Sequence, residues 1–193
     1  RKPRLPPWNK LDSWRCSQVL SFFPTPYPDE LWYSVIARYH THSGALSWQA
    51  TMEALFGDVR DTDVGSFFPN GSIHKILEQL PSGFLSAQEV ALQHTLLPFL
   101  MRFQSPDRKA AIMEAFLNGE DMRPRYLRAT RDIKPRSLRY CPICLQEDTQ
   151  TYGEPYWHRE HQIGLMPLCP RHRCRLLDKP IPNTRPLGAQ YLP

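Results

Sequence analysis

A cysteine-rich stretch near the C-terminus limits the possible folds of this chain more than any other feature of the sequence. Four of the five cysteines lie in residues 139–176, where Cys141 and Cys144 form a C-x2-C pair and Cys169 and His172 form a C-x2-H pair. Each pair can present two ligands to one metal ion, provided that the intervening chain folds back and brings the pairs together. The spacing therefore predicts a closed tetrahedral site for one structural Zn2+ ion, without an open position for water or substrate.

Two other sets of ligands fit the same stretch. His158 and His161 could replace the second pair in a two-cysteine, two-histidine finger, although their x2 spacing is shorter than is usual in such fingers. Cys174 could instead take the place of His172. Free buried thiols that bind no metal are disfavoured, because a paired spacing that occurs twice is a specific signal for metal ligands.

The composition is that of a globular chain built from short elements. Its 193 residues can form one moderate domain and a small metal module, and 41% of them are hydrophobic. The 20 prolines predict short helices with rigid connections. Clustered cysteines argue against a disulfide framework and for a reducing compartment, and no apolar run is long enough to span a bilayer. We therefore expect a soluble cytoplasmic protein without a membrane partner.

The first part of the chain has the outline of a helix-turn-helix. Apolar residues recur every four positions after Pro28, which predicts an amphipathic helix that begins at Pro28 and is ended by Gly44. Ser47 can cap a second helix that runs to Phe56. Two helices joined by a tight glycine turn are typical of this motif.

The second of these helices has the wrong charge for a DNA reader. It contains no lysine or arginine and carries Glu53, so it would face phosphate with a negative charge. We therefore expect a structural or protein-contacting element. Base reading by Gln49 and Thr51, as in a sequence-specific transcription regulator, is the alternative.

Further helices complete a helical domain that we expect to span residues 22–121. Residues 72–80 have apolar side chains on one side, and a capping box at Ser86 begins a helix that Pro98 kinks or ends. Ser105 is predicted to cap the last helix, which is expected over Pro106–Leu117. The fold class predicted is mainly α, with a helix-turn-helix-like element in the helical domain and a small zinc-finger module after it.

A basic link and the zinc-finger module are expected to form the next unit, residues 122–178. The link carries Asp132 and a run of cations, which are candidate nucleic-acid contacts, although such runs are often merely solvated faces. A rigid metal module beside the run could hold arginines against a phosphate backbone. The candidate residues are Arg123, Arg125, Arg128, Arg131, Lys134, Arg136 and Arg139.

The two ends of the chain are expected to lie outside these units. Residues 1–21 form a basic and aromatic arm, in which Trp8 and Trp14 could anchor in the groove of a partner, unless the arm is a loose leader. Residues 179–193 read as an extended tail. Because the chain begins at Arg1, we expect a processed or partial sequence.

A zinc-dependent nuclease is the alternative from another class of function. His158, Glu160 and His161 would then form the catalytic group. Hydrolysis requires an open metal position or a second metal among carboxylates. The sequence has no HExxH motif and no cluster of acids near the cysteines beyond Glu147, Asp148 and Glu154. We therefore predict a protein that is not an enzyme.

Two blocks of the sequence together resemble a known family. The first is FFPTPYPDELWYSVIARYHTHSG at residues 22–44, and the second comprises RYCPIC, YGEPYWHREHQ and PLCPRH within residues 139–172. Over about residues 22–178 the chain resembles the TniQ/TnsD family of transposon target-site selectors. The resemblance implies a helical part with a helix-turn-helix and then a zinc finger whose ion is held by the two pairs described above. His158 and His161 would then pack beside the ligands.

The resemblance also implies a function. Members of the family choose where a transposon inserts, because they recognise an attachment site in DNA or bind a CRISPR effector complex that has done so. They recruit the AAA+ ATPase TnsC, which in turn activates the transposase. By resemblance, this chain is expected to be a non-catalytic bacterial adaptor, either a short member of the family or the N-terminal part of a longer selector.

Overall fold

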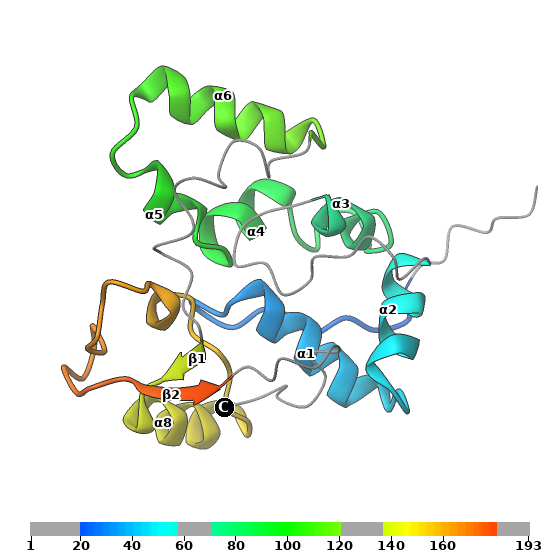
Figure 1. Cartoon of the computed structure of the whole chain (residues 1–193). Coiled ribbons are helices and arrows are strands. Elements are labelled where there is room, and N and C mark those ends of the chain that lie inside the picture. The colour runs from blue at the N-terminus through cyan, green and yellow to red at the C-terminus, as the bar shows by residue number, and fades with distance from the viewer. Residues whose placement is uncertain (1–19, 58–70, 121–136, 181–193) are drawn as a thin grey trace, which may run out of the picture.

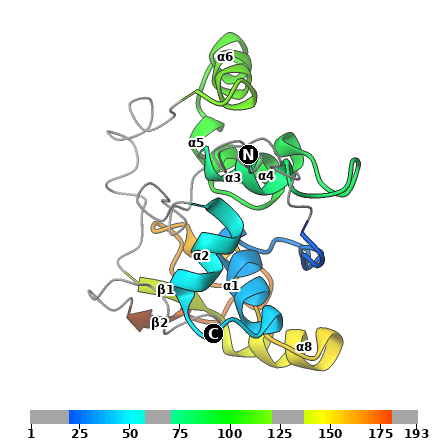
Figure 2. The same cartoon turned by 90° about the vertical axis from the view of Figure 1, so that its right-hand side faces the viewer.

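The computed structural model describes residues 20–57, 71–120 and 137–180 of the chain. In Figures 1 and 2 the elements stack in tiers, with α6 at the top, α3, α4 and α5 below it, then α1 and α2, and the strands with α8 at the base. No helix in these ranges is long and apolar enough to cross a bilayer. The prediction of a mostly helical chain is confirmed. Its elements are α1 (Trp32–Ser43), α2 (Trp48–Phe56), α3 (Ser72–Leu77), α4 (Ala87–Gln93), α5 (Leu97–Met101), α6 (Pro106–Leu117), β1 (Ser137–Tyr140), α8 (Pro142–Tyr152), the 3-10 helix η3 (Glu160–Gln162) and β2 (Leu177–Pro180).

Helix α1 begins at Trp32 and not at Pro28, so its predicted start is wrong. Asp29 has a positive φ of 57°, a backbone conformation that interrupts a helix. Glu30 forms an isolated antiparallel bridge with His158. The backbone before α1 is therefore shaped by a partner that lies far away in the sequence.

The turn between α1 and α2 follows the predicted outline. Gly44 has a φ of 68°, in the left-handed region that glycine adopts without strain, and it ends α1. Ser47 then caps α2, because its Oγ accepts a hydrogen bond of 3.1 Å from the backbone N–H of Ala50. Helix α2 ends at Phe56, as expected.

The side chains of α2 favour a role other than base reading. Thr51 is buried, and its Oγ1 lies 2.6 Å from Nδ1 of His40, so this candidate reader belongs to the core. The amide of Gln49 is exposed but donates a hydrogen bond of 3.1 Å to Glu53 on the next turn. The exposed side of α2 therefore carries Glu53 and no cation, which does not suit contact with phosphate.

Serine caps define two later helices as predicted. The Oγ atom of Ser86 accepts a hydrogen bond of 3.1 Å from the backbone N–H of Glu89, at the first turn of α4. The Oγ atom of Ser105 does the same for Arg108 at 3.4 Å. Helix α6 then spans Pro106–Leu117, with the predicted bounds.

Two other helix ends differ from the prediction. Helix α3 ends at Leu77, earlier than expected. Helix α4 ends at Gln93, because the carbonyl oxygen of the next residue, His94, accepts a hydrogen bond of 2.7 Å from Trp32 of α1. Pro98 neither kinks nor ends α4; it lies in the first turn of a separate helix, α5, where its missing N–H costs nothing.

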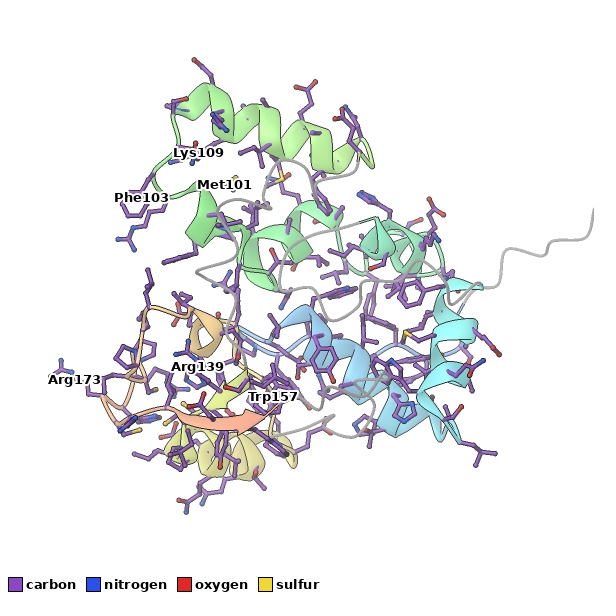
Figure 3. All side chains as sticks on the ribbon, in the orientation of Figure 1. Met101, Phe103, Lys109, Arg139, Trp157 and Arg173 are labelled. Carbon is purple, nitrogen blue, oxygen red and sulfur yellow. The ribbon has the colours of Figure 1, made fainter. Side chains whose placement is uncertain are left out.

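One hydrophobic core joins the helices to the C-terminal part. Trp157, Leu138 and Ile163 pack in the same cluster of buried residues as Val35 of α1. Trp157 is fully buried and lies near the strands in the lower half of the molecule (Figure 3), and burial of so large an apolar side chain contributes at least about 1.5–3 kcal/mol to stability. The module predicted for residues 122–178 therefore shares a core with the helices before it, and the boundary between them stays a prediction.

Candidate metal centre

Four side chains converge in the C-terminal part of the molecule. One ligand atom each from Cys141, Cys144, Cys169 and His172 lies within 4.8 Å of all the others. The Sγ atoms of Cys144 and Cys169 are 3.8 Å apart, and Nδ1 of His172 lies 3.3 Å from Sγ of Cys144. The three cysteines are buried. This is the set that the spacing predicts, and the cluster could bind a metal ion such as zinc.

The two pairs are built on different elements but have the same local geometry. Cys141 is the N-cap of α8, and its Sγ accepts a hydrogen bond of 3.4 Å from the backbone N–H of Cys144. In the second pair, Sγ of Cys169 accepts a hydrogen bond from the backbone N–H of His172, also at 3.4 Å. Each of these bonds favours the charged form of the sulfur, which is the form that binds metal.

A two-stranded sheet brings the pairs together. Strands β1 and β2 are antiparallel, with Tyr140 opposite Leu177. Cys141, which follows β1, is therefore brought close to Leu176, which precedes β2 and packs against the buried cysteines. The chain between the pairs folds back, as the spacing requires.

The chemistry of the donors fits a divalent cation. Burial raises the pKa of the Cys144 thiol, and the neighbouring sulfurs of Cys169 and Cys141 raise it further. Buried thiolates this close together need a positive charge between them. Three sulfurs and one imidazole nitrogen are a donor set that zinc uses in closed tetrahedral sites.

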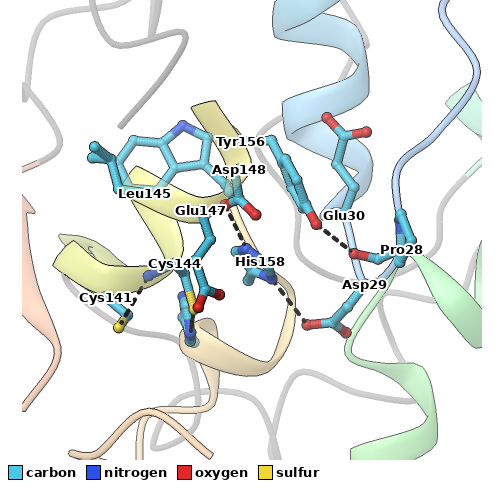
Figure 4. A network of polar contacts seen from close by, with 12 residues as sticks. Pro28, Asp29, Glu30, Cys141, Cys144, Leu145, Glu147, Asp148, Tyr156 and His158 are labelled. Carbon is cyan, nitrogen blue, oxygen red and sulfur yellow. Dashed lines mark hydrogen bonds and ion pairs between the residues drawn. The ribbon is translucent and has the colours of Figure 1, made fainter. Parts of the chain in front are cut away.

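The two histidines of residues 157–161, which we call the WHREH segment, do not belong to the group of converging ligands. His158 lies between two carboxylates (Figure 4), with Nε2 2.9 Å from Asp148 and Nδ1 3.8 Å from Asp29. His161 packs beside the cluster, with Nε2 3.9 Å from Sγ of Cys144. Both nitrogens of His158 are therefore engaged elsewhere, and the two-histidine finger is not the arrangement that the chain adopts.

Cys174 lies at the edge of the cluster. Its Sγ is 3.2 Å from Sγ of Cys141, and its carbonyl oxygen accepts a hydrogen bond of 2.8 Å from the backbone N–H of Cys169. The group of four converging atoms nevertheless contains His172 and not Cys174. Cys174 thus closes the turn that presents the second pair.

The group considered for hydrolysis lies next to the cluster and not around a metal site of its own. His158, Glu160 and His161 line a cavity of about 420 Å³. In the part of the chain that the structure describes, the Cys3His cluster is the one group of converging metal ligands, and His158, Glu160 and His161 are not among its members.

A buried network of charges holds the WHREH segment and its neighbours against α1. Glu30 is fully buried, and its Oε2 lies 2.9 Å from Nη1 of Arg38. Nε of the same arginine lies 2.7 Å from Oε1 of Glu154, which follows α8. We call Glu30, Arg38 and Glu154 the clamp. Sequence reasoning missed these residues, because nothing in the spacing shows that the two blocks meet.

Backbone hydrogen bonds run alongside the clamp. The N–H of Leu31 donates to the carbonyl of Trp157 at 2.8 Å, and the N–H of Arg159 donates to the carbonyl of Asp29 at 2.7 Å. The guanidinium of Arg159 also pairs with the Asp29 carboxylate at 2.9 Å. The segment before α1 and the segment before η3 are therefore joined as two short strands would be.

The clamp predicts a pH dependence of stability. Burial raises the pKa of Glu30 from 4.5 to about 7, against the opposing effect of Arg38. The folded state therefore holds the proton of the Glu30 carboxyl more tightly than the unfolded state does. The contribution of this group to the free energy of unfolding is complete below pH 4.5 and is lost as the pH rises through 7. The loss amounts to about 3 kcal/mol.

The measurement is urea unfolding of the metal-loaded chain at pH 5 and pH 8. Glu30→Gln is expected to remove this part of the pH dependence, so that it loses less stability than the wild type between pH 5 and pH 8. Glu114→Gln, an exposed change on α6, should leave the pH profile unaltered. Identical pH profiles for the wild type and Glu30→Gln would contradict the burial of a charged carboxylate.

Most of the predicted nucleic-acid contacts and both anchoring tryptophans lie outside the described residues. Arg139 is described, and it is turned inward (Figure 3). Its Nη1 donates to the carbonyl of Met166 at 3.0 Å and its Nη2 donates to the carbonyl of Ile163. Its side chain thus closes the loop after η3 instead of facing solvent. The residues outside the described ranges are Trp8, Trp14, Arg123, Arg125, Arg128, Arg131, Lys134 and Arg136.

The second pair of ligands presents arginines that sequence reasoning did not single out. Arg171, Arg173 and Arg175 are all exposed around the turn that holds His172, and Arg173 projects from the edge of the molecule in Figure 3. Arg171 pairs with Glu147 at 3.1 Å. The alternation of arginines in PRHRCR, residues 170–175, is the sequence signal for this basic turn.

Comparison with known proteins places this geometry in a family. The family model of TniQ matches residues 21–176, a range that contains α1, the clamp and the complete Cys3His cluster. The chain is also 30% identical over 155 residues to the transposon Tn7 transposition protein TnsD of Escherichia coli. The aligned region covers 78% of this chain and 30% of the length of TnsD. The chain therefore belongs to the TniQ family and is a distant homologue of TnsD of Tn7.

Proposed function

We propose that this chain is a non-catalytic target-site selector in DNA transposition. The observation that carries the proposal is the family match over residues 21–176, because it includes both the helical part and the metal centre. The relative TnsD is by name a transposition protein. A closed four-ligand metal centre agrees with a protein that recognises a site and passes the signal on without chemistry.

The proposed cofactor is one structural Zn2+ ion in the Cys3His cluster. It would be held by Cys141, Cys144, Cys169 and His172. The ion would supply the positive charge that the buried sulfurs need, and it would fix the turn of the second pair against α8. Since the clamp and the shared core join this module to α1, the ion would stabilise α1 together with the two strands and α8.

The proposed partners are the AAA+ ATPase TnsC and either target DNA or a CRISPR effector complex. The transposase would be engaged indirectly, through TnsC. The exposed side of α2, which carries Glu53 and no cation, suits a protein surface, and Trp8 and Trp14 would add aromatic anchors. A chain that contacts both sides could convey the location of the target to the ATPase.

DNA contacts are proposed for two basic segments. The first is the basic link, Arg123 to Arg136, and the second is the exposed pair Arg173 and Arg175 beside the metal centre. No ion pair of Arg173 or Arg175 is present among the described residues, so both guanidinium groups remain available to phosphate. Such contacts would position the protein on DNA without specifying the sequence.

The salt dependence of DNA binding distinguishes the two segments. Each phosphate contact that is lost should reduce the slope of log affinity against log salt by about 0.9. Arg173→Gln with Arg175→Gln is therefore expected to reduce the slope by up to about 1.8. Arg102→Gln, an exposed change before α6, is the matched control and should have no effect. Fluorescence anisotropy with duplex DNA at several salt concentrations measures the slope.

An unchanged slope in the double variant would place the DNA contacts elsewhere. The corresponding triple variant of the link, Arg125→Gln, Arg128→Gln and Arg131→Gln, is measured in the same way. A change in this variant alone would assign the phosphate contacts to the link and not to the metal module.

The experiment that tests the function is co-purification with TnsC from the same transposon, with and without target DNA. The proposal predicts that the chain forms a complex with TnsC. This complex should require α2 and the arm of residues 1–21, and it should require no catalytic activity of the chain. Failure to bind TnsC in either condition would contradict the adaptor role. Cleavage of duplex DNA that is lost in a folded His161→Ala variant would instead establish the nuclease alternative.

A further inference from the structure

Glu147 contacts the ring of His172 on the side that faces away from the cluster. Nδ1 of His172 lies 3.3, 3.5 and 3.7 Å from the three sulfurs. Its Nε2 lies 3.2 Å from Oε1 of Glu147. The imidazole is therefore held between the metal ligands and a carboxylate, with a different nitrogen directed at each.

The position of Glu147 follows from the helix that begins at the first ligand pair. Cys144 and Glu147 are three residues apart on α8, so they lie on the same face of the helix and one turn apart. The other oxygen of Glu147, Oε2, accepts a hydrogen bond of 3.1 Å from Arg171. Glu147 thus joins α8 to the turn of the second pair without being a ligand.

We propose that Glu147 is a positioning residue of the metal centre, which accepts the Nε2–H of His172 and thereby leaves Nδ1 free to bind the ion. A neutral imidazole has one donor and one acceptor nitrogen, so fixing the proton on Nε2 makes Nδ1 the ligand. A carboxylate on the far nitrogen also raises the basicity of the ligand. This inference rests on the proposed zinc centre.

The ion pair between Glu147 and Arg171 is too exposed to account by itself for the loss of zinc binding that we expect when Glu147 is replaced. The side chain of Glu147 is 42% exposed and that of Arg171 is 58% exposed, whereas His172 is 17% exposed. Exposed pairs of this kind contribute little to stability, because water screens them. Loss of Glu147 should therefore act through His172, and loss of Arg171 should matter much less.

Zinc affinity, measured on the full chain by competition with a chelating dye, tests the proposal. Glu147→Ala is expected to weaken zinc binding by about 10- to 100-fold, the usual effect of removing a partner of a ligating histidine. Gln146→Ala, an exposed change on the same helix, and Arg171→Met are the controls, and each should stay within about twofold of wild type. Glu147→Gln keeps an acceptor without the charge and should fall between wild type and Glu147→Ala.

A second readout separates positioning from a general structural role. In the zinc-loaded chain labelled with 15N-histidine, the Nε2–H of His172 should give a proton signal that exchanges slowly with water. The signal should persist in Glu147→Gln, where the amide oxygen still accepts, and should be lost by fast exchange in Glu147→Ala. If Glu147→Ala does not fold, the test rests on the Nε2–H signal in Glu147→Gln and in Arg171→Met, which should persist in both variants.

The outcomes that overturn the inference differ from those that overturn the zinc centre. Tight zinc binding by wild type that is unchanged in Glu147→Ala, or a loss that is equally large in Gln146→Ala, would overturn the role of Glu147 alone. Absence of the Nε2–H signal from folded, zinc-loaded wild type would do the same. A wild-type chain that binds no zinc would overturn the metal centre and this inference with it.

Discussion

Cys169→Ser is expected to unfold the turns that carry the ligands and to abolish stoichiometric zinc binding. The small cluster around these turns contains Leu176 as its buried apolar residue besides the cysteines, so the turns bury little apolar surface without the ion. In structural zinc sites the binding free energy is folding free energy, on the order of 10–16 kcal/mol. Removal of one of the four ligands should therefore cost enough of this free energy to unfold the turns that carry the ligands.

The matched control is Cys174→Ser. Its sulfur lies 3.2 Å from that of Cys141, closer than Nδ1 of His172 at 3.5 Å, but Cys174 is not one of the four converging residues. It should keep one zinc per chain and a wild-type fold. Zinc content by elemental analysis and limited proteolysis of residues 137–180 are the measurements. Retention of zinc by Cys169→Ser, or equal loss in Cys174→Ser, would show that the ligand set is wrong.

Arg38→Met is expected to have the second largest effect, a loss of about 3–5 kcal/mol at pH 8. This change leaves the carboxylate of Glu30 buried without its cation and removes the bond to Glu154. The side chain of Arg38 also lies over the ring of Tyr27, with 3.6 Å from its guanidinium carbon to the ring centre. The clamp would then no longer join α1 to Glu154 in the segment after α8, although the metal ligands remain intact.

Urea unfolding of the zinc-loaded chain measures this loss. Arg171→Met removes an exposed ion pair and should cost no more than about 1 kcal/mol. The double variant Arg38→Met with Glu30→Gln should recover on the order of 1–3 kcal/mol, because the uncompensated charge is gone. Equal, small effects of Arg38→Met and Arg171→Met would show that the clamp does not stabilise the fold.

The sequence predicted those features whose cause is local. The caps at Ser47, Ser86 and Ser105 depend on a side chain and an N–H three residues later, and each is present in the structure. The ligand pairs are equally local, since each places two donors within one turn of chain. Only the convergence of the two pairs required the fold, and their spacing was specific enough to predict it.

The features that the sequence did not reveal depend on contacts between distant segments. The pattern at Pro28 is a good helix start, but pairing of Glu30 with His158 holds the chain extended until Trp32. His158 has the spacing of a ligand but is held by Asp148 and Asp29.

Arg139 ends a run of cations, yet its guanidinium donates hydrogen bonds to two backbone carbonyls of the loop after η3. In each of these cases a long-range partner overrides the local signal, and no periodicity or spacing records such a partner.

X-ray absorption spectroscopy at the zinc edge of the purified chain tests the central claim most directly. A closed Cys3His centre predicts three sulfur scatterers at about 2.3 Å and one nitrogen at about 2.0–2.1 Å, with no oxygen in the first shell. A shell with two nitrogens would contradict the account, because it would indicate a second histidine ligand from the WHREH segment. A shell with a water oxygen in a vacant position would also contradict it.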